Sequence, residues 1–224
     1  MSQAPFKSAS RQQLNVLAPL EKKVLIWLAS RMPAWVHPDH LTLLGFLGMV
    51  MAGVSYYFAR WNPLWLIGAV VFLGVNWFGD SLDGTLARFR DKQRPRYGFY
   101  VDHIVDSFGA IFLIGGLGLS GYMTGTVAMV LLIAYFLLSI EIYLATYTVG
   151  VFRLSFGMWG PTELRILLSI GTLVLLRKPM VTIAGERYLL CDVGAVAAII
   201  SLTVITIFSV IRNTVRLYRE ERIP

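Results

Sequence analysis

The 224-residue sequence has little charge and few of the side chains that bind soft metals. Only 15% of its residues are charged, 56% are hydrophobic, and the mean hydropathy is +0.65. This balance excludes an ordinary soluble domain, in which about a quarter of the residues are charged. The single cysteine, Cys191, excludes an internal disulfide and a thiolate metal cluster. The composition is that of an integral membrane protein.

Long uncharged runs predict helices that span a membrane. Runs of sufficient length cover residues 41–59, 61–79, 107–140 and 193–211. The sequence GLSGYMTG at 118–125 divides the longest run into two spans, and a shorter span is predicted over 161–176. The runs do not alternate as the strands of a barrel do. The predicted fold is therefore all-α, with six transmembrane helices.

The basic residues predict how these helices are oriented. Sixteen of the twenty Lys and Arg residues fall on the side of the predicted bundle that carries both termini. We therefore expect both termini to lie in the cytoplasm, in a multi-pass protein of a cytoplasmic or inner membrane. The net charge of +7 is attributed to this topology and to anionic lipid headgroups, with no role for nucleic acid. The charged N-terminal segment is not expected to be a cleaved signal peptide.

The sequence before the first span is predicted to form a cytoplasmic segment, residues 1–37, with one amphipathic helix. Apolar residues recur there at three- and four-residue spacing, namely Leu14, Leu17, Leu20, Val24 and Leu28. The pattern predicts a helix that lies in the membrane interface or packs across the cytoplasmic ends of the bundle. Pro19 marks its first turn or a break. Residues 38–224 are predicted to form one transmembrane domain.

Four aspartates flank two of the predicted spans, in the sequence GDSLDGTLARFRDKQRPRYGFYVDHIVDSFGA at 79–110. Asp80 and Asp83 are three residues apart and Asp102 and Asp106 are four apart, so each pair shares one face of a helix. The two spans are consecutive and antiparallel, which brings both pairs to the same depth. Four carboxylates near lipid cost on the order of 10 kcal/mol unless something compensates them. Without a His or Cys cluster, the expected ligand is Mg²⁺, Mn²⁺ or Ca²⁺.

Two other interpretations of the aspartates stay open at this point. The acids pair with arginines of the intervening loop (Arg88, Arg90, Arg94 and Arg96), or they form the ion path of a small cation-coupled transporter. The residues between the acids favour a phosphate site. Gly84 and Ala87 leave room for close approach, and the guanidinium of Arg88 can bind a phosphate through two nitrogens. Together they indicate a pyrophosphate bridged by metal ions.

The spacing of these residues resembles the signature of the CDP-alcohol phosphotransferase family, also called the CDP-alcohol phosphatidyltransferases. The matching positions are Asp80, Asp83, Gly84, Ala87, Arg88, Gly98, Asp102 and Asp106. The start of the first span, at 38–45, resembles the Pro-Asn-x-x-Thr-x-x-Gly sequence of the family, with Asp39 in place of Asn.

The resemblance implies a transferase of phospholipid biosynthesis. Such an enzyme moves a phosphatidyl-type group from a CDP-diacylglycerol-type lipid donor to a small alcohol acceptor, and CMP leaves. The resemblance also implies two Mg²⁺ or Mn²⁺ ions held by Asp80, Asp83, Asp102 and Asp106, with Asp106 as the general base as well. The implied CDP contacts are Asp39, Thr42, Gly84, Ala87, Arg88 and Gly98. A homodimer in the membrane is implied too. The reverse assignment, CDP-choline or CDP-ethanolamine reacting with diacylglycerol, stays open.

The acceptor pocket is predicted on the later helices, where ionisable residues occur within apolar sequence. Glu141 lies in such a stretch, and Glu163 and Arg165 begin the predicted 161–176 span. We favour Glu163 and Arg165 as acceptor contacts; the alternative is a structural contact between the two. Acids would suit an amino-alcohol, whereas a phosphorylated acceptor needs cations, of which Arg153 would supply another. The acceptor itself is not predicted.

Overall fold

The computed structural model describes residues 10–11, 17–152 and 160–221. Its helices are α1 (Ala18–Arg31), α2 (Pro38–Ala59), α3 (Trp65–Phe89), α4 (Pro95–Leu119), α5 (Gly125–Val149), α6 (Pro161–Leu175) and α7 (Leu190–Glu220). Strand β1 (Ser10–Arg11) runs parallel to β2 (Val151–Phe152), and β3 (Met180–Ile183) forms an antiparallel hairpin with β4 (Glu186–Leu189). The predicted all-α membrane fold is confirmed.

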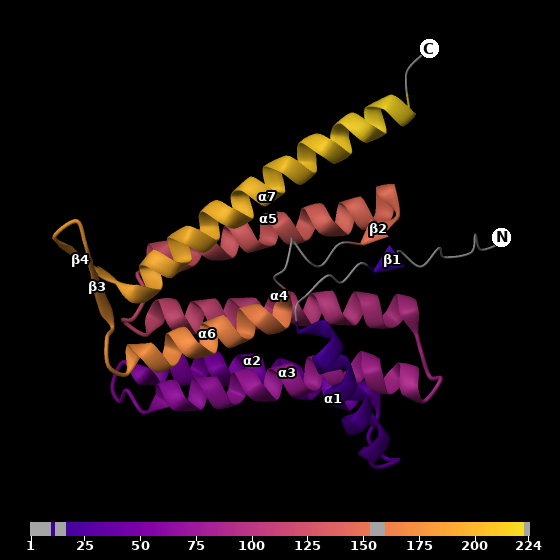
Figure 1. The fold of residues 1–224 in the computed structure, drawn as a ribbon, viewed down its shortest axis with the longest axis horizontal. Helices are drawn as coiled ribbons and strands as arrows, with labels where there is room; N and C mark the ends of the chain where they lie inside the picture. Colours follow the sequence, from indigo (N-terminus) through magenta and orange to yellow (C-terminus); the bar gives the residue numbers. More distant parts are fainter. Residues whose placement is uncertain (1–9, 12–16, 153–159, 222–224) are drawn as a thin grey trace.

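The helices pack around a central antiparallel pair, α2 and α3 (Figure 1). Helix α4 packs on α2, while α1 and α6 pack on α3. Helix α5 packs on α4 and also on α7. The α3–α4 loop marks one end of the bundle, here called the loop end, and the β3–β4 hairpin lies at the other, the hairpin end.

Within the part of the chain that the structure describes, five helices are long and apolar enough to cross a membrane, namely α2, α3, α4, α5 and α7. They correspond to five of the six predicted spans. The sixth predicted span forms α6, which has 15 residues, fewer than the roughly 20 that a span needs. Helix α6 is short because it begins at Pro161, partway along α3, and ends before the hairpin. Proline at this first position is favourable because it needs no amide partner there.

The two helices that carry the aspartates continue well beyond their apolar runs. Helix α3 extends to Phe89 and α4 begins at Pro95, so all four aspartates lie on regular helix. The loop at 90–94 turns sharply, with Asp91 in a left-handed conformation at a φ of 53°. Aspartate tolerates this region better than most residues, because its short side chain bonds locally. The acidic faces of the two helices are thereby held antiparallel.

Small residues bring α2 close to both neighbours. A Cβ atom placed on Gly45 would lie 3.0 Å from the backbone nitrogen of Asp80, and the buried Asn76 amide donates to the Gly45 carbonyl at 3.0 Å. On the side of α4, a Cβ atom on Gly53 would overlap the carbonyl oxygen of Phe112. The N-terminal half of α2 is thus fixed against the part of α3 that carries Asp80.

We expect Gly53→Ala to destabilise the protein by about 2 kcal/mol or more, because the added methyl group meets rigid backbone. Gly74→Ala is the matched control, since a Cβ atom there has no neighbour within 4 Å. It should be neutral, or stabilising by up to about 1 kcal/mol, as for other helical glycines. Thermal unfolding in detergent measures both. Equal unfolding temperatures for the two variants would contradict the close α2–α4 packing.

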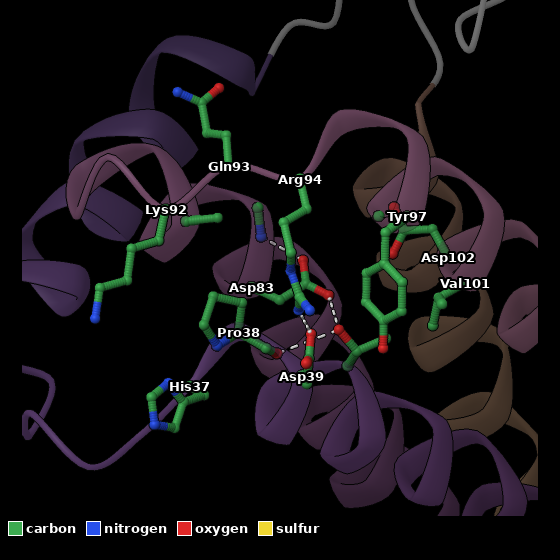
Figure 2. A pocket seen from close by; sticks show the side chains of 14 residues that line it. His37, Pro38, Asp39, Asp83, Lys92, Gln93, Arg94, Tyr97, Val101 and Asp102 are labelled. Atoms are coloured by element: carbon green, nitrogen blue, oxygen red, sulfur yellow. Dashed lines mark hydrogen bonds and ion pairs between the residues drawn. The ribbon is translucent and has the colours of Figure 1, made fainter.

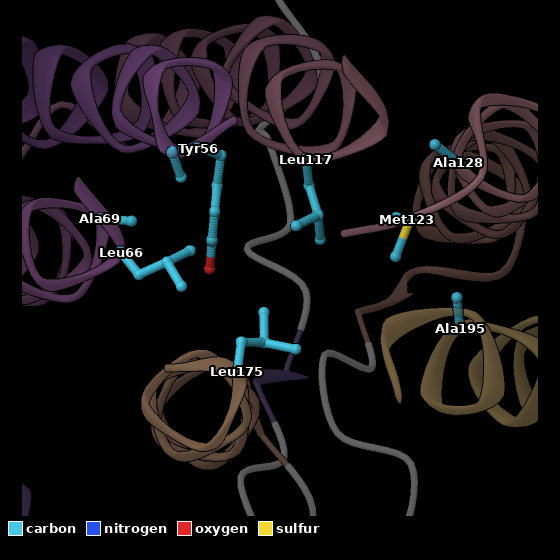
Figure 3. Packing of buried hydrophobic residues seen from close by; sticks show 9 residues of the cluster. Tyr56, Leu66, Ala69, Leu117, Met123, Ala128, Leu175 and Ala195 are labelled. Atoms are coloured by element: carbon cyan, nitrogen blue, oxygen red, sulfur yellow. The ribbon is translucent and has the colours of Figure 1, made fainter. Parts of the chain in front are cut away.

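A cluster of buried side chains at the hairpin end joins α2, α3, α4 and α6 (Figure 3). Tyr56 is fully buried there and packs with Leu66, Leu117 and Leu175. Its hydroxyl lies 2.6 Å from that of Thr172 in α6, and the two share a hydrogen bond. This cluster fixes the C-terminal half of α6 against the bundle.

Helix α1 packs on the outside of α3. Leu25 and Ala29 are buried against Leu82 and Leu86, and Pro19 lies in the first turn of the helix. Apolar side chains on its other side are exposed, namely Leu20, Val24, Ile26 and Trp27. One face of α1 therefore contacts the bundle, and an apolar strip faces outward, as in a helix that lies at a membrane interface.

Candidate active site

The four aspartates line two neighbouring cavities between α2, α3 and α4. Asp83 and Asp102 line the larger cavity, of about 440 Å³. Asp80, Asp102 and Asp106 line the smaller one, of about 10 Å³. Asp102 and Thr42 of α2 border both cavities. The structure therefore brings the two predicted acidic pairs to one site.

The two aspartates of α3 have different partners. Asp83 is buried, and it accepts hydrogen bonds from the Thr42 hydroxyl at 2.6 Å and from the backbone amide of Gly84. Asp80 forms an ion pair with Arg165 of α6, with 2.6 Å between Oδ2 and Nη2. The two side chains of this pair are only 24% and 17% exposed. Arg165 thus brings a third helix to the acidic cluster.

Asp106 interacts electrostatically with the three other aspartates and with Arg165. Four neighbouring carboxylates repel one another when ionised, so the cluster attracts cations or protons. Within the described residues, no three His, Cys, Asp or Glu side chains stand close enough together to hold a metal ion. The contacts of Asp80 with Arg165 and of Asp83 with Thr42 use oxygens that an ion would need. The chemistry of the donors, carboxylates with a hydroxyl beside them, fits a hard divalent cation.

Five of the six residues predicted to contact CDP line the larger cavity, namely Asp39, Thr42, Gly84, Ala87 and Gly98. The sixth, Arg88, is not among its lining residues. Its guanidinium donates to the Thr85 hydroxyl at 3.2 Å, and Nη1 lies 3.3 Å from where a Cβ atom of Gly84 would be. Arg88 therefore lies beside the glycine that opens the cavity.

The loop between α3 and α4 and the first turn of α4 supply cavity residues that sequence periodicity did not single out. Lys92, Gln93, Arg94 and Tyr97 all line the larger cavity. Arg94 reaches across to Asp39 in an ion pair, and its Cζ atom lies 4.1 Å from the centre of the Tyr97 ring (Figure 2). The hydrogen bond from Arg94 to Asp39 raises the pKa of the guanidinium, which keeps it charged. Their position in the sequence could have indicated these residues, because the loop joins the two helices that carry the acidic pairs.

Two of the loop arginines that were candidates to pair with the four aspartates have other described partners. Arg90 donates to the backbone carbonyls of Met32 and Val36, and Arg94 pairs with Asp39. Arg165, which lies 85 residues from Asp80 in the sequence, forms an ion pair with this aspartate of the cluster.

The residues predicted for the acceptor pocket lie in different places. Arg165 lies at the aspartates. Glu163 accepts hydrogen bonds from the backbone amides of Gly160 at 3.0 Å and Leu17 at 3.2 Å, so it caps α6 and ties this helix to α1. Arg153 lies outside the described residues.

The described hydrogen bonds of Glu141 are with α7 and not with the four aspartates. Its Oε1 accepts hydrogen bonds from the Ser209 hydroxyl at 2.8 Å and the Asn213 amide at 2.7 Å. Both partners belong to α7. Glu141 therefore joins α5 to α7 within the apolar part of the bundle.

The sequence of this chain is similar to those of known proteins across the whole site. Residues 35–212 match the family model described as CDP-alcohol phosphatidyltransferase. The chain belongs to the CDP-alcohol phosphatidyltransferase family. The matched region contains the four aspartates, all the predicted CDP contacts and Arg165. Membership of this family favours an enzyme over a cation transporter.

A named relative in the same family is an archaetidylinositol phosphate synthase from Pyrococcus horikoshii. It is 30% identical to this chain over 104 residues, which are 46% of this chain and 52% of the relative. The similarity therefore spans about half the length of that synthase.

Proposed function

We propose that this protein transfers a phosphatidyl-type group from a CDP-diacylglycerol-type lipid donor to an alcohol acceptor and releases CMP. One observation carries the proposal. Seven of the eight residues of the family signature line two neighbouring cavities, of which the larger holds the small residues Gly84, Ala87 and Gly98, and the smaller holds Asp106. A site between membrane helices suits a reaction with one lipid reactant and one water-soluble reactant.

The larger cavity is proposed to hold the CDP part of the donor. Its volume of about 440 Å³ falls within the range of about 300–1,000 Å³ that is typical of small-molecule sites. The glycines and alanine on its wall let a diphosphate approach the backbone closely. Lys92 and Arg94 on the other side supply positive charge for that diphosphate. Thr42 and Asp39 supply polar groups at the start of α2.

The four aspartates are proposed to hold two Mg²⁺ or Mn²⁺ ions. Bound there, such ions would neutralise charge on the transferring phosphate and leave the acceptor in line with it. Asp102 is suited to contact both ions because it borders both cavities. Asp80 and Asp83 extend from one turn of α3 toward the same region. The donor set contains only oxygen, which favours these ions over zinc.

Asp106 is proposed to be the general base. Its carboxylate takes the proton of the acceptor hydroxyl as the acceptor oxygen forms a bond to the phosphorus that carries the lipid. The bond between that phosphorus and the oxygen of CMP breaks, and CMP leaves with its electron pair. Asp106 lines the smaller cavity beside Asp80 and Asp102, and it can therefore meet a hydroxyl that lies next to the phosphate.

The acceptor is proposed to carry a phosphate. The ionisable side chain that α6 brings to the aspartates is the cation Arg165, whereas Glu163 is engaged with two backbone amides. A guanidinium favours an anionic acceptor over an amino-alcohol. The name of the Pyrococcus relative, which describes the synthesis of an inositol phosphate lipid, supports the same choice. Arg153 is proposed as a second cation for this phosphate.

Release of CMP by the purified protein in lipid tests these assignments. We expect CDP-diacylglycerol with Mg²⁺ or Mn²⁺ to yield CMP when inositol phosphate or glycerol phosphate is added. Serine, ethanolamine and choline should be at least about tenfold less effective, because they lack the phosphate that Arg165 would bind. Arg165→Ala should raise the KM of the phosphorylated acceptor about tenfold or more.

Three outcomes of the same assay would count against the proposal or a part of it. CMP release that requires CDP-choline or CDP-ethanolamine with diacylglycerol would show the reverse assignment. No metal-dependent CMP release with any CDP donor would refute the transferase itself. Preference for an amino-alcohol acceptor would refute only the phosphorylated class.

Two further proposals concern the surroundings of the site. The N-terminal residues, the α3–α4 loop and the C-terminal end of α7 are proposed to be cytoplasmic, which is supported by the basic residues of these segments.

The protein is also proposed to act as a homodimer in the membrane. Labelling of single introduced cysteines from either side, in a Cys191→Ser background, and cross-linking in native membranes test these two points.

A further inference from the structure

One carboxylate oxygen outside the two cavities joins three helices. Oε1 of Glu21, in α1, accepts hydrogen bonds from the indole nitrogen of Trp77 at 2.9 Å, the Ser81 hydroxyl at 3.3 Å and the Thr162 hydroxyl at 2.7 Å. Trp77 and Ser81 belong to α3, and Thr162 lies in the first turn of α6. Glu21 is half-buried at this junction. Its place in the sequence, beside Lys22 and Lys23, suggests only a solvated helix face.

The Glu21 contacts lie next to a contact of the proposed active site. Ser81 directly follows Asp80, and Thr162 precedes Arg165 by three residues. The Asp80–Arg165 ion pair therefore joins the same turn of α3 to the same turn of α6 that Glu21 joins from outside. Residues three apart on a helix are neighbours on its surface. A shift of Thr162 would be passed directly to Arg165.

Helix α6 depends on these contacts at its N-terminal end. It packs chiefly on α3, and the cluster around Tyr56 fixes it near the hairpin end, through Thr172 and Leu175. Near Pro161, α6 has polar contacts with α1 and with Asp80 of α3. Glu163 accepts from the Leu17 amide at 3.2 Å, and Thr162 donates to Glu21. Helix α1 therefore holds the first turn of α6 in place.

We propose that Glu21 is a positioning residue for Arg165. By accepting hydrogen bonds from α3 and α6 at one oxygen, it sets where the first turn of α6 lies along α3, and so where the guanidinium lies relative to the aspartates. The kinetic part of the test rests on the proposed transferase function; the structural part does not.

Kinetics with separate titration of the two substrates measure the effect. Glu21→Ala should raise the KM of the acceptor about tenfold, because Arg165 is on the acceptor side. The KM of the CDP lipid should change less than about twofold, because none of the described residues that line the larger cavity belongs to α1 or α6. Glu21→Gln should stay close to the natural protein, because all three donors converge on one oxygen that an amide also has.

Two controls separate positioning from a general loss of stability. Glu220→Ala removes an exposed glutamate whose described ion pair is with Arg216 in the same helix, and it should change neither KM. In an Arg165→Ala background, Glu21→Ala should have no further effect on the acceptor KM, because the residue through which it acts is gone. A full additional tenfold rise in that background, or equal rises in both KM values, would overturn the proposal.

Hydrogen exchange measured by mass spectrometry tests the structural part without any turnover. Glu21→Ala should speed exchange at least about threefold in peptides that cover 160–168, and leave the hairpin at 180–189 unchanged. Unchanged exchange at 160–168 would overturn the positioning role even in an active protein. Absence of CMP release by the natural protein, with faster exchange in the variant, would instead refute the transferase and leave the structural role standing.

Discussion

Asp106→Asn is expected to lower the rate of CMP release by about 10³-fold or more. Asparagine keeps the size of the side chain, but its amide cannot take the proton of the acceptor hydroxyl. It also removes one negative charge from the wall that Asp106 shares with Asp80 and Asp102. Single-turnover measurement with saturating donor and acceptor isolates the chemical step from binding.

Asp192→Asn is the matched control for this substitution. Asp192 is an aspartate at the hairpin end, where it accepts hydrogen bonds from the amide and the hydroxyl of Thr124 at 2.8 and 2.5 Å. Its replacement should leave the rate of CMP release within about twofold, because it lies away from both cavities. Both variants should be shown to be folded by thermal unfolding. An Asp106→Asn protein with the natural rate would refute the assignment of the base.

Removal of divalent cations is expected to abolish CMP release, and addition of Mg²⁺ or Mn²⁺ to restore it. The physical reason is the excess negative charge that the four aspartates bring to one site. The same excess predicts an effect on stability. Cations that bind the folded site at 100 times their Kd should raise the unfolding temperature by about 5 °C or more.

Asp102→Asn tests where this stabilisation comes from. Asp102 borders both cavities, so its replacement should remove most of the rise in unfolding temperature that Mg²⁺ or Mn²⁺ produces. The Asp192→Asn protein should keep the full rise. If chelation leaves CMP release intact, or if Asp102→Asn keeps the full temperature rise, the aspartates do not hold the ions.

The spacing of the four aspartates was enough to predict their shared site. Asp80 and Asp83 fall on one helix face by their three-residue separation, and Asp102 and Asp106 do so by theirs. The short loop between the two helices then forces the two faces together. Hydropathy predicted the long helices for a similar reason, because about 20 apolar residues have few alternatives to a membrane span.

Contacts between distant parts of the chain were not predictable from one sequence. Arg165 contacts Asp80 across 85 residues, and Thr162 contacts Glu21 across 141. No local periodicity records such contacts. The sequence therefore contained no sign that Glu21 joins α1 to α3 and α6, or that Glu163 caps α6. Whether α6 crosses the membrane was also not predictable. Its apolar run shows where the helix lies in the sequence, but not at which point along α3 the helix begins.

The short α6 has a consequence for the bilayer around the protein. Its 15 residues rise about 22 Å, whereas the hydrocarbon core is about 30 Å thick. The missing length is at the end where Arg165 lies, since the other end is anchored through Leu175. Lipid beside α6 must be thinner than the bulk bilayer unless other parts of the protein complete the span. Hydrophobic mismatch would then let a polar acceptor descend to the level of the aspartates, and the acyl-chain length of the host membrane becomes a determinant of turnover.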